Sequence, residues 1–296
     1  AISVAAMDAL PSFKAARIDM ASGPDITAMV ANGADAEARG RLVRFRDDPR
    51  TDVDPVTGAG DESLGCHTAD YAYNGARAGD IVAVQRGICP RTDRATLGQR
   101  EGAAAVIMIN DSDALPPFEG PIRGVSIPFL GVRGTVARRF ATDDGRTIRI
   151  HARAPLANPG FRSVATFSSA GPRSGDSGVK PDVTAPGVSI MSADGATTGG
   201  VKGMSGTSMA SPAVAGVAAL VLQAHPDWSP RDVKAAIVGT ATTGRLSSYD
   251  LRVAGSGLVQ PRRAVDTVAF VTTSPGSSSL SFGARNATRR SGTSSA

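Results

Sequence analysis

Ser208 is the residue best placed for chemistry in this sequence, within the stretch GMSGTSMASPAVAGVAALVLQAH from Gly203 to His225. A glycine turn is predicted to deliver this serine to the first turn of a helix. The free backbone N–H groups and the positive end of a helix dipole stabilise negative charge beside a hydroxyl. The position therefore suits a nucleophile whose reaction generates an oxyanion. The same pattern also suits a plain helix N-cap, so the GxS motif alone leaves both interpretations open.

The helix after Ser208 is predicted to be buried, because Ala, Val, Leu and Gly occupy almost all of its faces from Met209 onward. Pro212 falls within the first turn, where its missing N–H group is not needed. A further helix is predicted to begin after Ser229, a good N-cap that is followed by Pro230 at the first helical position and Asp232 in the first turn. This helix is expected to run to about residue 241.

The string GTSMASP followed by an Ala/Val/Gly helix closely resembles the nucleophile segment of the subtilisin-like serine proteases, the subtilases. The resemblance implies that Ser208 is the nucleophile and that its backbone N–H is an oxyanion donor. It also implies that Gly206 and Thr207 form the supporting turn. The family usually has a non-catalytic histidine where Ala213 stands, so this departure concerns packing. An esterase is disfavoured, because its elbow needs a glycine where Ala210 stands.

Three more segments are similar to subtilase sequence. FSSAGP and KPDVTAPG match segments that lie between the oxyanion-hole asparagine and the serine in the family. The first ends the predicted alternating strand SVATFSS (163–169). The second lies in the extended stretch 179–193, and we expect it to carry sheet and to hold the Ser208 turn. AISVAA (1–6) is predicted to be a buried parallel strand, and in subtilases a similar strand follows the oxyanion-hole asparagine.

The partners that a catalytic serine needs are not found at the expected places. Acyl transfer requires a base and an acid that orients it, and in subtilisin the chain order is Asp, His, Ser. Both partners, and the oxyanion asparagine, are therefore expected ahead of Ala1. His67, His151 and His225 lie in no HGTHVAG-like segment and are interpreted as surface or packing residues. The sequence is thus expected to hold the C-terminal portion of a catalytic domain, to require the N-terminal portion for activity and to be inactive alone.

Residues 22–150 have a different, turn-rich character. Within them GDIVAVQRG (79–87), AAVIMIN (104–110) and IPFLGV (127–132) are predicted strands, and RTDRATLGQREGA (91–103) is a predicted polar helix. These segments resemble a protease-associated domain. In subtilases such a domain is often inserted into the catalytic domain at this point, where it is non-catalytic and has proposed roles in substrate access or protein contacts.

The two cysteines, Cys66 and Cys89, fall within this region, and their number alone distinguishes neither a disulfide nor two free thiols. The resemblance implies a disulfide between them, since cysteines at these positions commonly pair in secreted members. It also implies a secreted or cell-surface protein, because disulfides persist in oxidising compartments.

Composition excludes several classes of function. The net charge of +5 comes from scattered arginines and aromatic residues make up 4% of the chain, so a nucleic-acid partner is not expected. The apolar run 213–222 is too short to span a membrane. No D-x-D-x-D-G loop is present, and neither a metal nor a cofactor is predicted.

The expected fold is therefore α/β: part of a subtilisin-like parallel sheet with helices, plus an inserted β-rich α+β protease-associated domain. The expected function is that of a serine endopeptidase acting on protein or peptide substrates. The rival interpretation is a non-catalytic protein-binding module built on the inserted domain. The predicted divisions are 1–21 with 151–266 for the catalytic part, 22–150 for the inserted domain, and 267–296 for a Ser/Thr/Gly-rich tail in which SLSFG begins a truncated β-sandwich.

Overall fold

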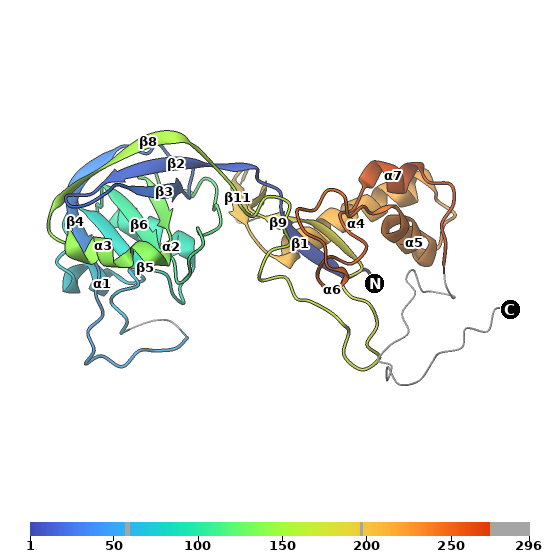
Figure 1. The fold of residues 1–296 in the computed structure, drawn as a ribbon, viewed down its shortest axis with the longest axis horizontal. Helices are drawn as coiled ribbons and strands as arrows, with labels where there is room; N and C mark the ends of the chain where they lie inside the picture. The colour runs from blue at the N-terminus through green and yellow to red at the C-terminus, as the bar shows by residue number, and fades with distance from the viewer. Residues whose placement is uncertain (57–59, 196–197, 273–296) are drawn as a thin grey trace. The chain divides into compact units, whose positions relative to one another are not determined.

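The computed structural model describes residues 1–56, 60–195 and 198–272 (Figure 1). The chain forms two compact units. One comprises Pro11–Asn158 with Met191–Met204 and is called the barrel unit. The other comprises Ala1–Leu10, Pro159–Ile190 and the chain from Ser205 onward, and is called the serine unit. The predicted β-sandwich start SLSFG and most of the tail lie outside the described residues.

Seven strands of the barrel unit close into a barrel in the order β2-β3-β7-β6-β5-β4-β8. The strands β4 to β7 pair in parallel, and the remaining pairs are antiparallel. Their inward side chains form one apolar core, which includes Leu42, Ile81, Ile107 and Ile150. The strands are β2 (Ser12–Asp19), β3 (Ile26–Val30), β4 (Ala38–Arg44), β5 (Ile81–Gln85), β6 (Ala105–Ile109), β7 (Phe129–Val132) and β8 (Thr147–Ala157).

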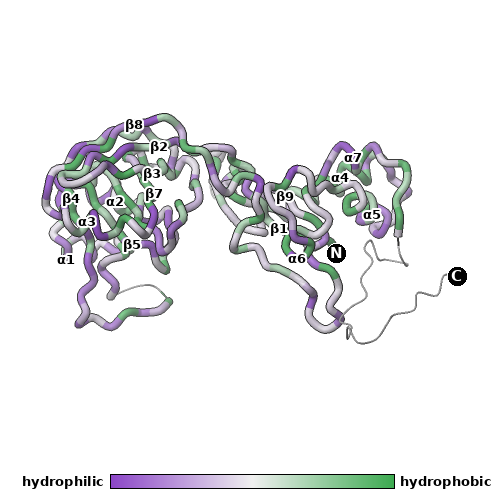
Figure 2. The backbone as a smooth tube through the Cα atoms, in the orientation of Figure 1, coloured by the Kyte–Doolittle hydropathy of each residue, from purple (hydrophilic) through white to green (hydrophobic). Residues whose placement is uncertain are grey.

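The sequence pattern explains which of these strands are covered. Strands β5 and β6 are almost entirely apolar and buried, as parallel strands with both faces covered should be. Strand β8 instead alternates between hydrophobic and hydrophilic residues where it faces the core on one side only (Figure 2). The predicted strands at 79–87, 104–110 and 127–132 are confirmed.

The helices of the barrel unit are α1 (Thr68–Tyr73), α2 (Arg91–Arg100), the 3-10 turn η1 (Gly134–Val136) and α3 (Ala137–Thr142). The predicted helix 91–103 is confirmed as α2, although it ends at Arg100. Strands β10 (Ile190–Ala193) and β11 (Val201–Met204) form a separate two-stranded sheet.

The serine unit is built on a parallel pair of strands, β1 (Val4–Asp8) and β9 (Val183–Val188). The apolar core around this pair includes Ala6, Val183, Val214 and Ile237. The helices are α4 (Thr207–Ala224), α5 (Pro230–Thr240), α6 (Leu251–Ala254) and α7 (Pro261–Asp266). The predicted N-terminal strand is confirmed as β1, shifted by a few residues.

The predicted start of α5 is confirmed in detail. Ser229 is its N-cap, and the Ser229 hydroxyl accepts from the backbone N–H of Asp232. The Asp232 carboxylate accepts in return from the backbone N–H of Ser229 at 2.9 Å, which completes a capping box.

The division between the units differs from the predicted one at residues 21 and 150. Strands β2 and β8 form an antiparallel pair that runs from Ser12 opposite Ala157 to Asp19 opposite Arg149. Both strands therefore belong to the barrel, and the boundaries fall after Leu10 and after Asn158.

The predicted strand SVATFSS is wrong. Residues 163–169 form turns, with only an isolated bridge between Val164 and Met7. The physical reason is that this segment bonds to β1 partly through its backbone and partly through a side-chain hydroxyl, so no regular strand ladder forms. The Ala165 N–H donates to the Ala6 carbonyl at 2.8 Å, and the Ala6 N–H donates to the Ser168 hydroxyl at 3.1 Å.

The prediction that α4 is a buried helix is also wrong for the described residues. A single stripe is buried, made of Ala210, Val214, Val217 and Val221, while Leu220 on the outer side is 50% exposed. The reason is that β1, β9, α5 and α7 contact this helix along one side only. Helix α4 as a whole is long and apolar enough to cross a membrane, whereas the run 213–222 alone is too short. The core helices of soluble proteins can reach the same length and hydropathy.

Candidate active site around Ser208

Ser208 lies exposed in the first turn of α4. Gly206 is the N-cap of this helix, so Ser208 itself is not the cap. The φ of 166° and ψ of 160° at Gly206 are extended backbone, which any residue can adopt. A Cβ at Gly206 would meet its nearest atom, the Met209 Sδ, at an ordinary 3.6 Å. The predicted glycine turn is therefore an extended entry into the helix.

The end of β9 holds this entry in place. The Gly206 N–H donates to the Gly187 carbonyl at 2.7 Å, and the Ser189 N–H donates to the Ser205 hydroxyl at 2.9 Å. Gly187 leaves no room for a side chain, because a Cβ there would lie 2.6 Å from the Ala6 Cβ and 2.9 Å from the Gly206 oxygen. The prediction that KPDVTAPG supports the Ser208 turn is confirmed by these contacts.

The start of α4 leaves two backbone donors available. The N–H groups of Met209 and Ala210 donate to the Gly206 carbonyl at 3.0 and 3.4 Å. In the described part of the chain, the N–H groups of Thr207 and Ser208 donate to no acceptor. Such free N–H groups at a helix start are the ones that bind and stabilise anions.

The Ser208 hydroxyl forms no hydrogen bond with another described residue, and each histidine is engaged elsewhere. His67 is the N-cap of α1. His151 has Nε2 3.2 Å from Asp19 and Nδ1 3.3 Å from Glu37.

The third histidine belongs to the same unit as Ser208 but lies at the other end of α4. His225 stacks on the Trp228 ring at 3.8 Å, and its Nε2 is 2.8 Å from the Val265 carbonyl. The 18 residues of α4 separate it from Ser208 by about 25 Å. All three histidines therefore have the packing and surface positions that the sequence predicts, and His225, the histidine of the same unit, lies too far from Ser208 to act as its base.

Asp182 is a buried carboxylate that the sequence analysis did not identify, and it stabilises the strand pair β1–β9. Asp182 precedes β9 and lies 2.6 Å from the Lys180 ammonium and 3.0 Å from the Lys234 ammonium. It also accepts from the Ser3 N–H at 2.7 Å. Burial alone raises the pKa of Asp182, but these cations and the N–H donor outweigh burial and leave it below its usual value. Asp182 thus ties the start of β1 to β9 and α5.

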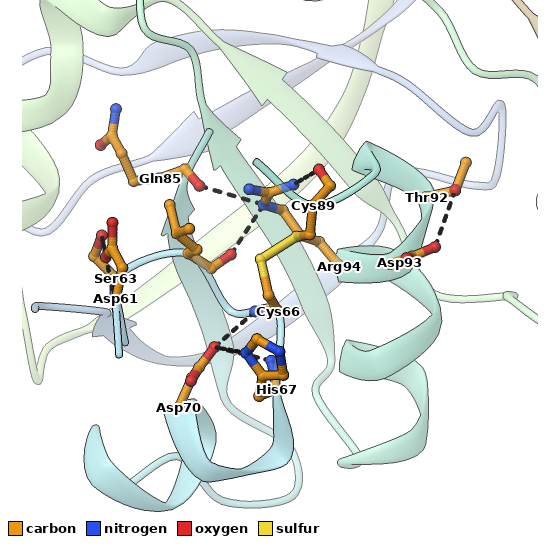
Figure 3. The surroundings of a disulfide bond; sticks show 11 residues. Asp61, Ser63, Cys66, His67, Asp70, Gln85, Cys89, Thr92, Asp93 and Arg94 are labelled. Carbon is orange, nitrogen blue, oxygen red and sulfur yellow. Dashed lines mark hydrogen bonds and ion pairs between the residues drawn. A yellow bond between two sulfur atoms is a disulfide. The ribbon is translucent and has the colours of Figure 1, made fainter. Parts of the chain in front are cut away.

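The disulfide between Cys66 and Cys89 is present, with Cα atoms 6.1 Å apart (Figure 3). Fully buried Arg94 lies beside it and donates from Nε to the Leu64 carbonyl at 2.9 Å and from Nη1 to the Cys89 carbonyl at 2.8 Å. Burial, with neighbouring arginines, lowers the pKa of Arg94 to about 10. Figure 3 shows these groups converging on the segment that the disulfide closes.

Asp70 holds the other side of this segment. Its carboxylate accepts from the backbone N–H groups of Cys66 at 2.7 Å and His67 at 2.9 Å. Burial raises the pKa of Asp70. Across the described ranges, no group of three or more His, Cys, Asp or Glu residues is arranged to hold a metal ion.

Sequence comparison with known proteins points to one family. Residues 14–258 match the subtilase family, Peptidase_S8. The minor extracellular protease Vpr of Bacillus subtilis (strain 168) is 31% identical over 215 residues, which are 67% of this chain and 25% of that protein. The subtilisin-like protease SBT1.5 of Arabidopsis thaliana is 32% identical over 224 residues, 64% of this chain and 28% of that protein. The chain thus spans about a quarter of the length of these relatives.

Among solved structures, the psychrophilic subtilisin-like protease Apa1 from Pseudoalteromonas sp. AS-11 aligns with 86% of this chain and 49% of its own. Its sequence identity is 18% and its TM-score 0.31, which is too low to carry an argument.

Proposed function

This chain belongs to the subtilase family, and on that basis we propose that it carries the nucleophile of a serine endopeptidase. The Ser208 oxygen attacks the carbonyl carbon of a peptide bond, and the amine leaves with a proton to give an acyl-enzyme that water hydrolyses. The backbone N–H of Ser208 stabilises the oxyanion. The observation that carries this proposal is an exposed hydroxyl in the first turn of α4, beside backbone N–H groups with no acceptor among the described residues.

The base, the acid and the oxyanion asparagine come from a further portion of the catalytic domain, and this chain alone is inactive. Two features of the serine unit support that proposal. Helix α4 leaves apolar Leu220 and Leu222 exposed. The pair β1–β9 is a two-stranded parallel sheet, whereas parallel sheets normally have more strands and both faces covered. A further portion that adds strands here would also cover α4.

The barrel unit is a protease-associated domain in this proposal. Its closed barrel and its disulfide suit a non-catalytic role in substrate access or protein contacts. The Bacillus subtilis relative is named as an extracellular protease, and this name and the disulfide support secretion. The rival function is a protein-binding module in which the barrel acts and Ser208 does not.

A fluorophosphonate probe that labels activated serines tests both functions. This chain should label slowly, since loss of triad members costs on the order of 10⁶ in turnover. The chain joined to a subtilase segment that carries Asp, His and Asn should label rapidly at Ser208. Ser208→Ala should abolish this labelling, and Ser211→Ala, on the same helix, should retain it. Rapid labelling of the isolated chain would contradict its inactivity, and an unreactive joined chain would favour the binding module.

A further inference from the structure

Two arginines stand directly opposite each other on the outside of the barrel. Arg39 of β4 and Arg149 of β8 are paired in the antiparallel register, and both side chains are exposed. Neither forms an ion pair or a side-chain hydrogen bond with any described residue. Like charges at directly opposed positions of neighbouring strands destabilise a sheet. The pair therefore presents two uncompensated guanidinium groups to solvent at a cost to the free barrel.

Two carboxylates on neighbouring segments, those of Asp19 and Glu37, contact other groups. Asp19 lies opposite Arg149 on the other neighbouring strand, β2. Its carboxylate instead contacts the Arg17 Nε at 2.7 Å and the His151 Nε2 at 3.2 Å. The Glu37 carboxylate contacts the His151 Nδ1 at 3.3 Å and accepts from the Ala152 N–H at 3.1 Å. Asp19 and Glu37 therefore have other partners, and neither forms an ion pair with Arg39 or Arg149.

Positive charge continues along β8 from this pair. Arg153 lies four residues after Arg149 and donates to the neutral hydroxyl of Thr27. Alternate residues on one face of a strand repeat every 6.8 Å or so. We call Arg39, Arg149 and Arg153 the basic stripe.

We propose that the basic stripe binds an acidic polypeptide segment in an extended conformation, through its carboxylates. Guanidinium groups bind carboxylates through paired, charge-assisted hydrogen bonds. In an extended segment, carboxylates four residues apart repeat at the spacing of Arg149 and Arg153 on β8. The binding uses side chains, because a closed barrel offers no free strand edge to which a peptide could add.

The surroundings of the stripe favour a polypeptide over a single-stranded nucleic acid. The strands that carry it, β4 and β8, contain no Phe, Tyr or Trp, and their one histidine, His151, lies between the carboxylates of Asp19 and Glu37. Bases of single-stranded nucleic acids bind by stacking on aromatic side chains. The stripe consists of residues of the barrel unit alone, so the proposal does not depend on whether Ser208 is catalytic.

The test is the affinity of the full 296-residue chain for a fluorescein-labelled decapeptide with glutamate at alternate positions, measured by fluorescence anisotropy at low salt. The double variant R39Q/R149Q should bind about tenfold more weakly, the equivalent of about 1.4 kcal/mol. The matched control R77Q/R138Q removes the same charge from two other exposed arginines of the barrel unit that have no ion pair among the described residues. It should change the affinity less than about twofold. Circular dichroism should show both variants folded.

Three results would overturn the proposal. The first is no measurable binding of the peptide by the unchanged protein. The second is equal weakening in R39Q/R149Q and R77Q/R138Q, which would show attraction by net charge alone. The third is a heparin hexasaccharide that binds much more tightly than the peptide and depends on Arg39 and Arg149, which would assign the stripe to a sulfated polysaccharide.

Discussion

Gly187 restricts the packing behind the Ser208 turn more tightly than the glycine of the GTS motif does. We predict that Gly187→Ala destabilises the serine unit by about 1–3 kcal/mol, because its Cβ would overlap the Ala6 Cβ and approach the Gly206 oxygen. The fluorescence of Trp228, the only tryptophan of the chain, reports unfolding of this unit in a denaturant titration. The control Gly216→Ala lies in α4 with nothing within 4 Å and should be neutral or stabilising by up to about 1 kcal/mol. Equal effects of the two substitutions would show that the space behind Gly187 is not limiting.

Asp182 should make the stability of the serine unit depend on pH. Its folded-state pKa lies below its usual value, so the carboxylate stabilises the fold above pH about 4, and this contribution is lost as the pH falls through the folded-state pKa. Asp182→Asn should cost about 2–4 kcal/mol at pH 7, since it leaves Lys180 and Lys234 without their counter-charge.

The measurement is Trp228 fluorescence in denaturant titrations between pH 7 and pH 2. The loss of stability in acid should be smaller in Asp182→Asn than in the unchanged protein. Asp227→Asn, at an exposed residue of the same unit with no ion pair among the described residues, should leave the acid dependence unchanged. Identical acid profiles for Asp182→Asn and the unchanged chain would contradict the assignment.

At the scale of elements, the sequence pattern correctly predicted the strands, helices and caps that depend on neighbouring residues. The apolar runs of β5 and β6, the polar helix α2 and the Ser229 cap of α5 were all foreseeable, because each depends on residues that are close in sequence. The strand predicted for SVATFSS was wrong because this segment meets β1 only through an isolated bridge and the Ser168 hydroxyl, and not through a continuous ladder. The contacts of Asp182 with Lys234 and of Gly187 with Ala6 join distant segments, and no spacing rule reveals them.

The disulfide is the element-scale feature whose removal has the clearest expected size. It closes a loop with a sequence separation of 23, and loss of such a constraint on the unfolded chain costs about 3 kcal/mol. We predict that the double variant Cys66→Ser with Cys89→Ser lowers the stability of the barrel unit by about this amount, measured by hydrogen exchange of the β5 and β6 amides. Trp228 fluorescence should show no change in the serine unit. A reductant should reproduce the effect in the unchanged protein and have none in the variant; an unaltered barrel in both would contradict the prediction.

At the scale of the whole molecule, the two units differ in how completely their strands are satisfied. The barrel has seven strands that close on themselves around one core. In its described residues the serine unit has two paired strands and an apolar helix of which a single stripe is buried. The change to turn-rich sequence at residues 22–150 predicted a second unit, but the boundary followed β2 and β8, whose long-range pairing was not visible in either segment alone. The outer face of α4 was likewise not predictable, because periodicity shows that a face is apolar and not what covers it.

This difference predicts the order in which the units yield to a protease. Cleavage by thermolysin requires local unfolding, and the free energy of opening is lowest where few apolar groups are buried and strand edges are open. The serine unit should therefore be cut first, with sites at Leu220 and Leu222 of α4, which are already half-exposed. Mass spectrometry should identify a resistant fragment close to residues 11–158. In the chain joined to a complementary catalytic segment, α4 should become protected while the barrel stays as it was. The opposite result would be a resistant core around Ser208 with the barrel degraded first. It would mean that the serine unit is the more stable one, although fewer of its apolar groups are buried.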